Sequence, residues 1–149
     1  MRGSGAIADE RSARAFLGIF EEGEGRTMID HVILNVKNLA SSRKFYEAAL
    51  EPLGYSVIMS SPQGVGFGDA GKPDFWIALR EPGNTGVHVA FGSRSRNRVK
   101  EFHQAALKAG GVDNGPPGIR EHYHKDYYGA FVLDPDGNNI EVVCHQPEE

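Results

Sequence analysis

Two histidines and one glutamate have the residue types and the setting of a metal site. His31 and His88 are 57 residues apart, and Glu141 stands among the apolar residues of the segment 140–144. A carboxylate buried without a partner is costly, and a metal ion is one good partner. Two imidazoles and one carboxylate, with coordination positions left open, form a known site for divalent iron and related metals. We therefore predict that these three residues bind a divalent ion such as Fe, Mn, Ni or Zn.

Each of the three residues also has a simpler interpretation. A single histidine in a strand is usually only a hydrogen-bonded side chain, and Glu141 alone could pair with an arginine. A water-filled site without a metal is a further alternative. The metal hypothesis rests on the combination of the three residues, and so on the elements that carry them.

The spacing of the two histidines belongs to an internal repeat. The segment that begins at Asp30 aligns without gaps with the segment that begins at Val87, and seven positions are identical. The identical pairs are His31 and His88, Val32 and Val89, Phe45 and Phe102, Ala48 and Ala105, Ala49 and Ala106, Leu50 and Leu107, and Gly54 and Gly111. A repeat of this length indicates two copies of one structural unit.

Each copy has the pattern of a βαβββ module. An alternating strand is followed by an amphipathic helix that ends at glycine, and short β-like runs separated by turn residues come next. The later runs are 55–60, 65–69 and 74–80 in the first copy, and 127–133 and 139–145 in the second, with a less certain run near 119–122. We expect an α+β domain over residues 28–149, made of modules 28–82 and 86–146. The predicted sheet is curved and mixed, with helices on its outer face and a concave cup on the inner face.

Strand alternation predicts which residues face the cup. If Val32 and Leu34 pack under the helix, His31 points to the other side, and His88 does the same in the second copy. In the last strand Glu141 and Val143 share one face, and Ile140 and Val142 share the opposite face.

Composition limits the possible partners. The chain has 149 residues, a net charge of −4 and one cysteine, Cys144. A basic face for nucleic acid is not expected, and no apolar run approaches the roughly 18 residues that span a bilayer. The single cysteine fits a reducing cytoplasm.

Residues 1–27 differ from the rest of the chain. Ala13, Phe16, Leu17 and Phe20 follow helical spacing between charged and glycine-rich ends. Two interpretations remain open. The segment is either a leader that precedes a natural start at Met28, or a native helix that packs on the body or on a partner subunit.

Other polar and aromatic residues are candidates for contact with a substrate. In the segment REHYHKDYY we assign His124 and Tyr128 to catalysis and Arg120 and His122 to substrate binding; a polar surface loop is the alternative. Two further candidates remain. Trp76 and Phe67 form either an apolar wall of the cup, in contact with the substrate, or part of the core. The segment Ser93–Arg98 is either a solvated loop and helix start or a phosphate site.

Two stretches resemble the signatures of the vicinal oxygen chelate superfamily. They are HVILNVKNLASSRKFYEAAL, from His31, and FVLDPDGNNIEVV, from Phe131. This group includes glyoxalase I, methylmalonyl-CoA epimerase, type I extradiol dioxygenases, fosfomycin-resistance thiol transferases and bleomycin-binding proteins. The resemblance extends from Met28 to His145. It implies metal ligands on the first and last strands of each module, at His31, Ala78, His88 and Glu141.

The sequence departs from the individual activities of this superfamily. Aligning the strand around Ala78 with the last strand puts Ala78 opposite Glu141, and alanine cannot supply the fourth ligand of glyoxalase I. His124 has the spacing of the extradiol signature, but Phe131 replaces its tyrosine. Ile33 replaces the hydroxyl residue of the fosfomycin enzymes.

The resemblance implies two classes of function. The first is a metal-dependent enzyme of the lyase, isomerase or dioxygenase type, acting on a small substrate with adjacent oxygens but without true glyoxalase I activity. The second is a metal-free protein that binds a drug or metabolite, as bleomycin-resistance proteins do. Metal analysis would separate them. A homodimer is expected in both cases, because two-module members commonly pair and open sheets have exposed edges.

Overall fold

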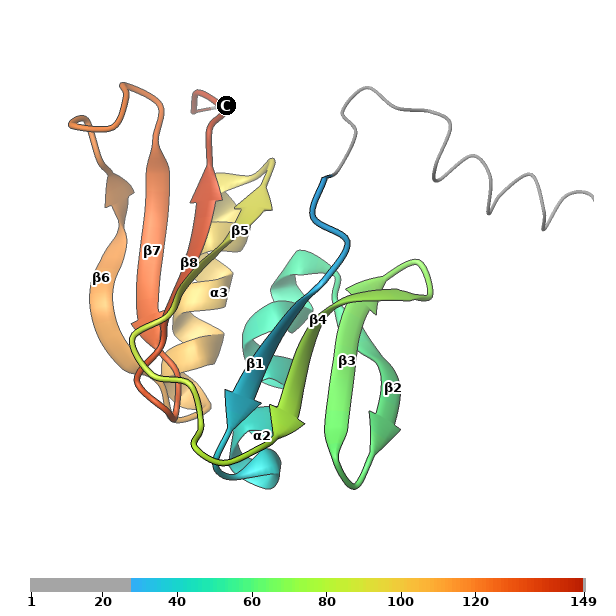
Figure 1. Ribbon diagram of the computed structural model, residues 1–149. Coiled ribbons are helices and arrows are strands. Elements are labelled where there is room, and N and C mark those ends of the chain that lie inside the picture. The colour runs from blue at the N-terminus through green and yellow to red at the C-terminus, as the bar shows by residue number, and fades with distance from the viewer. Residues whose placement is uncertain (1–27, 149) are drawn as a thin grey trace, which may run out of the picture. The chain divides into compact units, whose positions relative to one another are not determined.

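The structure is a computed structural model that describes residues 28–148 (Figure 1). Residues 1–27, for which a leader and a native helix were the alternatives, lie outside the described residues. The first module contains β1 (Val32–Val36), α2 (Leu39–Leu50), the 3-10 helix η1 (Glu51–Leu53), β2 (Ser56–Ser61), β3 (Gly64–Asp69) and β4 (Lys72–Leu79). The second contains β5 (His88–Ser93), α3 (Arg96–Lys108), β6 (Val112–Ile119), β7 (Tyr128–Leu133) and β8 (Asn139–Cys144). The predicted α+β class with two βαβββ modules is confirmed.

Each module forms its own four-stranded mixed sheet. The strand orders are β1-β4-β3-β2 and β5-β8-β7-β6. β1 pairs in parallel with β4, and β5 with β8, whereas the other neighbours are antiparallel. The helix after the first strand provides the crossover that a parallel pair needs. This topology brings the first and last strands of a module side by side, so that His88 and Glu141 lie on neighbouring strands.

Equivalent residues of the repeat cap the two helices. The side chain of Asn38 accepts a hydrogen bond from the Ser41 amide at the start of α2, and Ser95 does the same for the Arg98 amide at the start of α3. Such caps satisfy amide groups that have no partner within the helix. The repeat of 57 residues therefore extends from sequence identity to matching helix starts.

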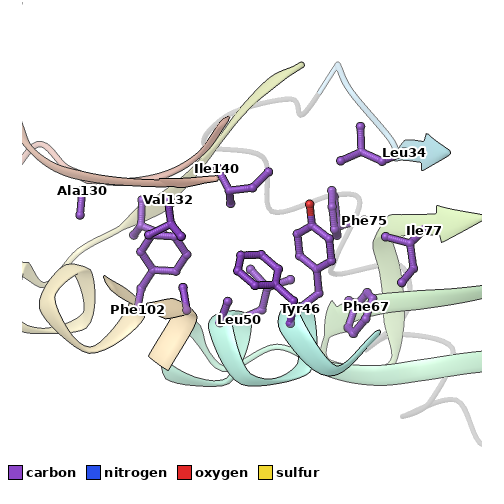
Figure 2. Close-up of a cluster of buried hydrophobic side chains, with 14 of the residues drawn as sticks. Leu34, Tyr46, Leu50, Phe67, Phe75, Ile77, Phe102, Ala130, Val132 and Ile140 are labelled. Atoms are coloured by element: carbon purple, nitrogen blue, oxygen red, sulfur yellow. The ribbon is translucent and has the colours of Figure 1, made fainter. Parts of the chain in front are cut away.

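The hydrophobic core lies between the helices and the sheets (Figure 2). Tyr46 and Leu50 of α2 and Phe102 of α3 are fully buried in one cluster with residues of β4 and β8. The ring of Phe75 also meets that of Phe91 across the two modules, with centroids 5.2 Å apart. Burial of one large apolar side chain contributes about 1.5–3 kcal/mol relative to exposure. One continuous core therefore joins the two modules.

The alternation predicted for the strands is observed. Leu34 and Val36 are buried, whereas Ile33, which precedes Leu34, is 41% exposed. In the second sheet Ile140 and Val142 belong to the core, so Glu141 between them points to the opposite side. We call the sides of the two sheets that face away from the helices their open faces.

The prediction for β6 was wrong. We expected a strand near residues 119–122, but the strand is Val112–Ile119, which contains Gly115, Pro116 and Pro117. These residues argue against a strand within a sheet, since proline cannot donate to the ladder. β6 is an edge strand, where one side needs no donors, and its pairing with β7 is interrupted by register shifts.

In the part of the chain that the structure describes, no helix combines the length and the apolar character needed to cross a bilayer.

Candidate active site

A histidine and a glutamate in hydrogen-bond contact occupy the open face of the second sheet. Glu141 is only 2% exposed, and its Oε1 lies 2.9 Å from Nε2 of His88. His88 itself is half exposed. The parallel pairing of β5 with β8 sets this arrangement, because Glu141 faces Ala90, the residue two positions after His88 on the same side of β5. An imidazole reachable from solvent thus contacts a buried carboxylate.

Tyr127 contacts the second oxygen of the carboxylate. Its hydroxyl donates a hydrogen bond to Oε2 of Glu141. A β-carbon at Gly129 would lie 3.3 Å from both that oxygen and the Tyr127 ring, so the absence of a side chain there leaves space for the two groups. Burial, followed by this hydrogen bond, raises the pKa of Tyr127 above its usual value. The phenol therefore stays protonated and able to donate at neutral pH.

Two further histidines lie against the Tyr127 ring. Nε2 of His124 is 2.7 Å from Nδ1 of His145, and ring centroids of the two histidines are 5.6 and 5.3 Å from that of Tyr127. The amide of Asp126 donates to Nδ1 of His124. That nitrogen must accept, so the neutral ring carries its proton on Nε2 and donates it to His145. His124, predicted to be catalytic, is thus one contact removed from the Glu141 pair.

Tyr128, predicted to be catalytic, lies on the other side of the sheet from Glu141. Its ring packs under the guanidinium of Arg96 at 5.2 Å, next to α3. Successive residues of a strand face opposite ways, so the pair of tyrosines is divided between the two faces. Tyr127 lies in the same candidate segment, but the sequence analysis assigned the catalytic role to Tyr128 instead. The signal was available, because Tyr127 has the same parity as Phe131, which pairs with Glu141.

Arg120 and His122 lie earlier in the same segment of the chain. The guanidinium of Arg120 stacks over the Phe131 ring at 5.5 Å and donates to the carbonyl of Pro116. The His122 ring packs on Tyr123, with centroids 4.1 Å apart. Since Phe131 lies opposite Glu141 in the sheet, Arg120 covers a neighbour of the His88–Glu141 pair.

Trp76 occupies the open face of the first sheet. It pairs with Ile33 on one side and with Gly66 on the other. A β-carbon at Gly66 would approach the indole carbons to 2.9 Å, so the ring lies over the glycine. Phe67, the other predicted wall residue, is fully buried against the rings of Tyr46 and Phe75. Of the two alternatives for Phe67, the structure supports the core.

The strand register corrects the counterpart of Glu141. Ile33 and Ala90 are equivalent in the repeat; Ile33 pairs with Trp76, and Ala90 pairs with Glu141. Trp76, rather than Ala78, therefore occupies the position that matches Glu141. An indole has no lone pair to offer a metal. We therefore still expect no metal ligand from the first module at this position, but the residue there is Trp76 instead of Ala78.

The donor pair matches part of a metal site. Neighbouring ligands of an octahedral ion with bonds of about 2.1 Å are roughly 3 Å apart, close to the spacing of His88 Nε2 and Glu141 Oε1. Within residues 28–148, however, no three His, Cys, Asp or Glu side chains are close enough to hold one ion. His31, which directly precedes β1, is thus not grouped with the pair in a single chain. Two of the three predicted ligands come together.

Comparison with known proteins places this site in a family context. The model of the Glyoxalase/Bleomycin resistance protein/Dioxygenase superfamily matches residues 28–142. A crystal structure of a glyoxalase/bleomycin resistance protein from Albidiferax ferrireducens is 30% identical, with a TM-score of 0.70 over 81% of this chain and 100% of that one. No protein of curated function matches the chain.

More distant structures share the fold. A glyoxalase/bleomycin resistance protein/dioxygenase family enzyme from Burkholderia phytofirmans is 20% identical, with a TM-score of 0.62 over 79% of this chain and 98% of that one. A lactoylglutathione lyase from Agrobacterium tumefaciens is 16% identical, with a TM-score of 0.58 over 80% and 94%. The chain belongs to the Glyoxalase/Bleomycin resistance protein/Dioxygenase superfamily.

Proposed function

We propose that this protein is a divalent-metal-dependent enzyme that acts on a small molecule with two adjacent oxygens. The observation that carries the proposal is the pairing of His88 with the buried carboxylate of Glu141. A carboxylate is seldom buried without a function or a strong partner. The position of this pair on the open face, beside a fixed phenol donor, is the environment of a reaction site.

The metal ligands in this proposal are His88, Glu141 and the partner subunit's His31. The repeat makes His31 and His88 equivalent, while one chain groups only two of the three ligands. A homodimer that joins the first module of one copy to the second module of the other would complete the set. When bound, the ion would supply Lewis acidity to adjacent substrate oxygens and stabilise negative charge on them.

The chain's own groups have separate tasks in this proposal. Tyr127 orients the Glu141 carboxylate and keeps a proton close to it. His124 and His145 hold the Tyr127 ring in position. Trp76 offers an apolar surface to the substrate. Since Trp76 replaces a second carboxylate, we expect no efficient proton transfer of the glyoxalase I type.

Metal content tests the proposal. Protein purified without chelators should contain a divalent ion, and the His88→Ala and Glu141→Gln variants should lose it. The matched control is His122→Ala, which removes another exposed imidazole of the second module and should keep the metal. Metal-free wild-type protein that cannot be loaded with Fe, Mn, Ni or Zn would overturn the proposal.

Mixed dimers test where the third ligand comes from. The His31→Ala and Glu141→Gln variants should each fail to bind metal as homodimers. If the site is shared between subunits, a mixed dimer of the two variants contains one intact site and regains binding. If the site lies within one chain, the mixed dimer contains none. Sedimentation that shows a monomer at micromolar concentration would contradict the shared site directly.

A metal-free binding protein is the second candidate. It is favoured by the fact that both oxygens of Glu141 already have partners within the chain, His88 and Tyr127. In this case the open face would bind a drug or metabolite by stacking and hydrogen bonds. Ligand binding that is unchanged after exhaustive metal removal would support this candidate.

A cytoplasmic location, expected from the single cysteine, stays a prediction.

A further inference from the structure

A cationic cavity lies at the start of α3, on the side of the second sheet away from Glu141. Its volume is about 170 Å³, and its lining includes the cations Arg94, Arg96 and Lys100, the ring of Tyr128 and one acid, Glu148. Tyr128 belongs to the helix-facing side of β7, whereas Tyr127 reaches the open face. The cavity is therefore separate from the candidate active site.

Two of the cations share one aromatic ring. The guanidinium of Arg96 lies 5.2 Å from the centroid of Tyr128, and the ammonium of Lys100 lies 6.0 Å from it. The electron-rich ring face attracts each cation, but it does not remove the repulsion between them. An anion placed between the two side chains would offset this repulsion.

Acidic side chains compensate this charge only in part. Arg96 has Asp126 at 3.8 Å and Glu148 at 3.9 Å, both at the limit of an ion pair. Among the described residues, Arg94 and Lys100 have no acidic partner, and both are exposed. Three cations thus line the cavity with one acid, and two of them, Arg94 and Lys100, are in no ion pair among the described residues.

The first turn of α3 adds to the same imbalance. It contains no acidic residue, whereas Arg96 and Arg98 are within it. Cations are unfavourable at the positive end of a helix dipole, and anions are favourable there. The helix start and the cations of the cavity thus favour a bound anion at the same place.

We propose that this cavity binds a phosphate group, either as inorganic phosphate or as the terminal group of a small phosphomonoester. A dianion offsets more of the charge than a carboxylate does, and guanidinium groups match phosphate oxygens in pairs. The volume holds one such group and leaves little room for a polymer. The net charge of −4 likewise disfavours an extended nucleic-acid surface.

Calorimetry at constant ionic strength tests the proposal. The full chain is titrated with inorganic phosphate and, separately, with glycerol 3-phosphate, and sodium chloride provides the reference. Saturable binding of phosphate is expected, with the Kd raised about tenfold in Arg94→Ala and in Lys100→Ala, as for loss of a charge-assisted hydrogen bond. Both side chains are exposed, so the variants should fold.

The repeat offers a matched control. Arg43 occupies the position of Lys100 in the first module, and Arg43→Ala should leave the Kd unchanged. Tighter binding of glycerol 3-phosphate than of inorganic phosphate would identify a phosphomonoester as the ligand, and the reverse would identify the free ion. A response equal to that of chloride, or equal weakening in Arg43→Ala and Lys100→Ala, would overturn the site.

Discussion

Tyr127 and Tyr128 are sequence neighbours with opposite surroundings. Tyr127 donates to the carboxylate of Glu141, whereas Tyr128 lies under Arg96 beside α3. The raised pKa of Tyr127, caused first by burial and then by the hydrogen bond to Glu141, keeps the phenol in its donor form. One step along the chain, at the start of β7, thus separates a residue of the candidate active site from a residue of the cationic cavity.

The two tyrosines provide a matched pair of variants. Tyr127→Phe removes one of the two partners of a buried carboxylate, so we expect the free energy of unfolding to fall by about 1 kcal/mol or less, after discounting for solvent screening. The Tyr128 hydroxyl has no hydrogen-bond partner among the described residues, so Tyr128→Phe should stay close to wild type. Urea unfolding measures both. Equal stabilities of the two variants would argue against the contact with Glu141.

Alternation could predict faces but not register. It correctly assigned Glu141 to the open face, yet it placed Ala78 opposite Glu141 where the structure has Trp76. A slip of two residues keeps every side chain on its face, so no hydrophobic pattern reveals it. Strands β4 and β8 also follow loops of different length, and a fixed offset of 57 therefore fails at the ends of the modules.

Strand β3 allows a direct test of the position of Trp76. A methyl group at Gly66 would meet the indole at 2.9 Å, so Gly66→Ala should displace the ring toward solvent and shift its fluorescence to longer wavelength. Trp76 is the only tryptophan of the chain, and the signal is therefore specific. Gly92→Ala is the control, because a β-carbon there meets nothing within 4 Å. An unchanged spectrum in Gly66→Ala would contradict the stacking.

A polar contact ties β6 to α3 and should respond to acid. Nε2 of His103 lies 2.9 Å from the carboxylate of Asp113, and this hydrogen bond lowers the pKa of Asp113. A carboxyl group whose pKa is lower in the folded than in the unfolded state stabilises the fold at pH values above its unfolded-state pKa. This stabilisation is lost as the pH falls through the folded-state pKa. Unfolding free energy should therefore drop faster below about pH 4 in wild type than in His103→Ala.

Titration of Asp113 by carbon NMR checks the cause. The pKa should rise toward its usual value in His103→Ala and stay unchanged in His122→Ala, in which a different exposed imidazole is removed. An Asp113 pKa that is insensitive to His103→Ala would assign the shift to the remaining contact, the amide of Gly115.

At the scale of the whole molecule, a buried polar cluster links the modules. The hydroxyl of Tyr46, on α2, donates to Asp134 in the turn before β8. Asp134 accepts from the side chain of Asn138, which in turn donates to the carbonyl of Asn84 between the modules. These hydrogen bonds and the continuous core both connect the two modules, so we expect the modules to unfold together.

Tyr46→Phe tests this link. Asp134 is 5% exposed, so loss of one donor should lower the free energy of unfolding by about 1–3 kcal/mol without splitting the transition. Tyr123→Phe, at an exposed position, should have no effect. Calorimetry would contradict the prediction if the variant unfolded in two separate steps.

The sequence allowed prediction of the modules because each copy repeats its own strand, cap and helix. It did not allow prediction of what depends on contacts between distant elements. The prolines of β6 hid a strand, and the grouping of His88 with Glu141 but not with His31 follows from how strands pair rather than from any local pattern.

The two prolines of β6 have a consequence for self-association. Pro116 and Pro117 remove two amide donors from the outermost strand of the second sheet. A strand from another molecule that approached this edge would find an interrupted template and could not extend the ladder. The β6 edge is therefore protected against edge-to-edge association. Copies that associate by strand addition must use one of the other edge strands, β1, β2 or β5.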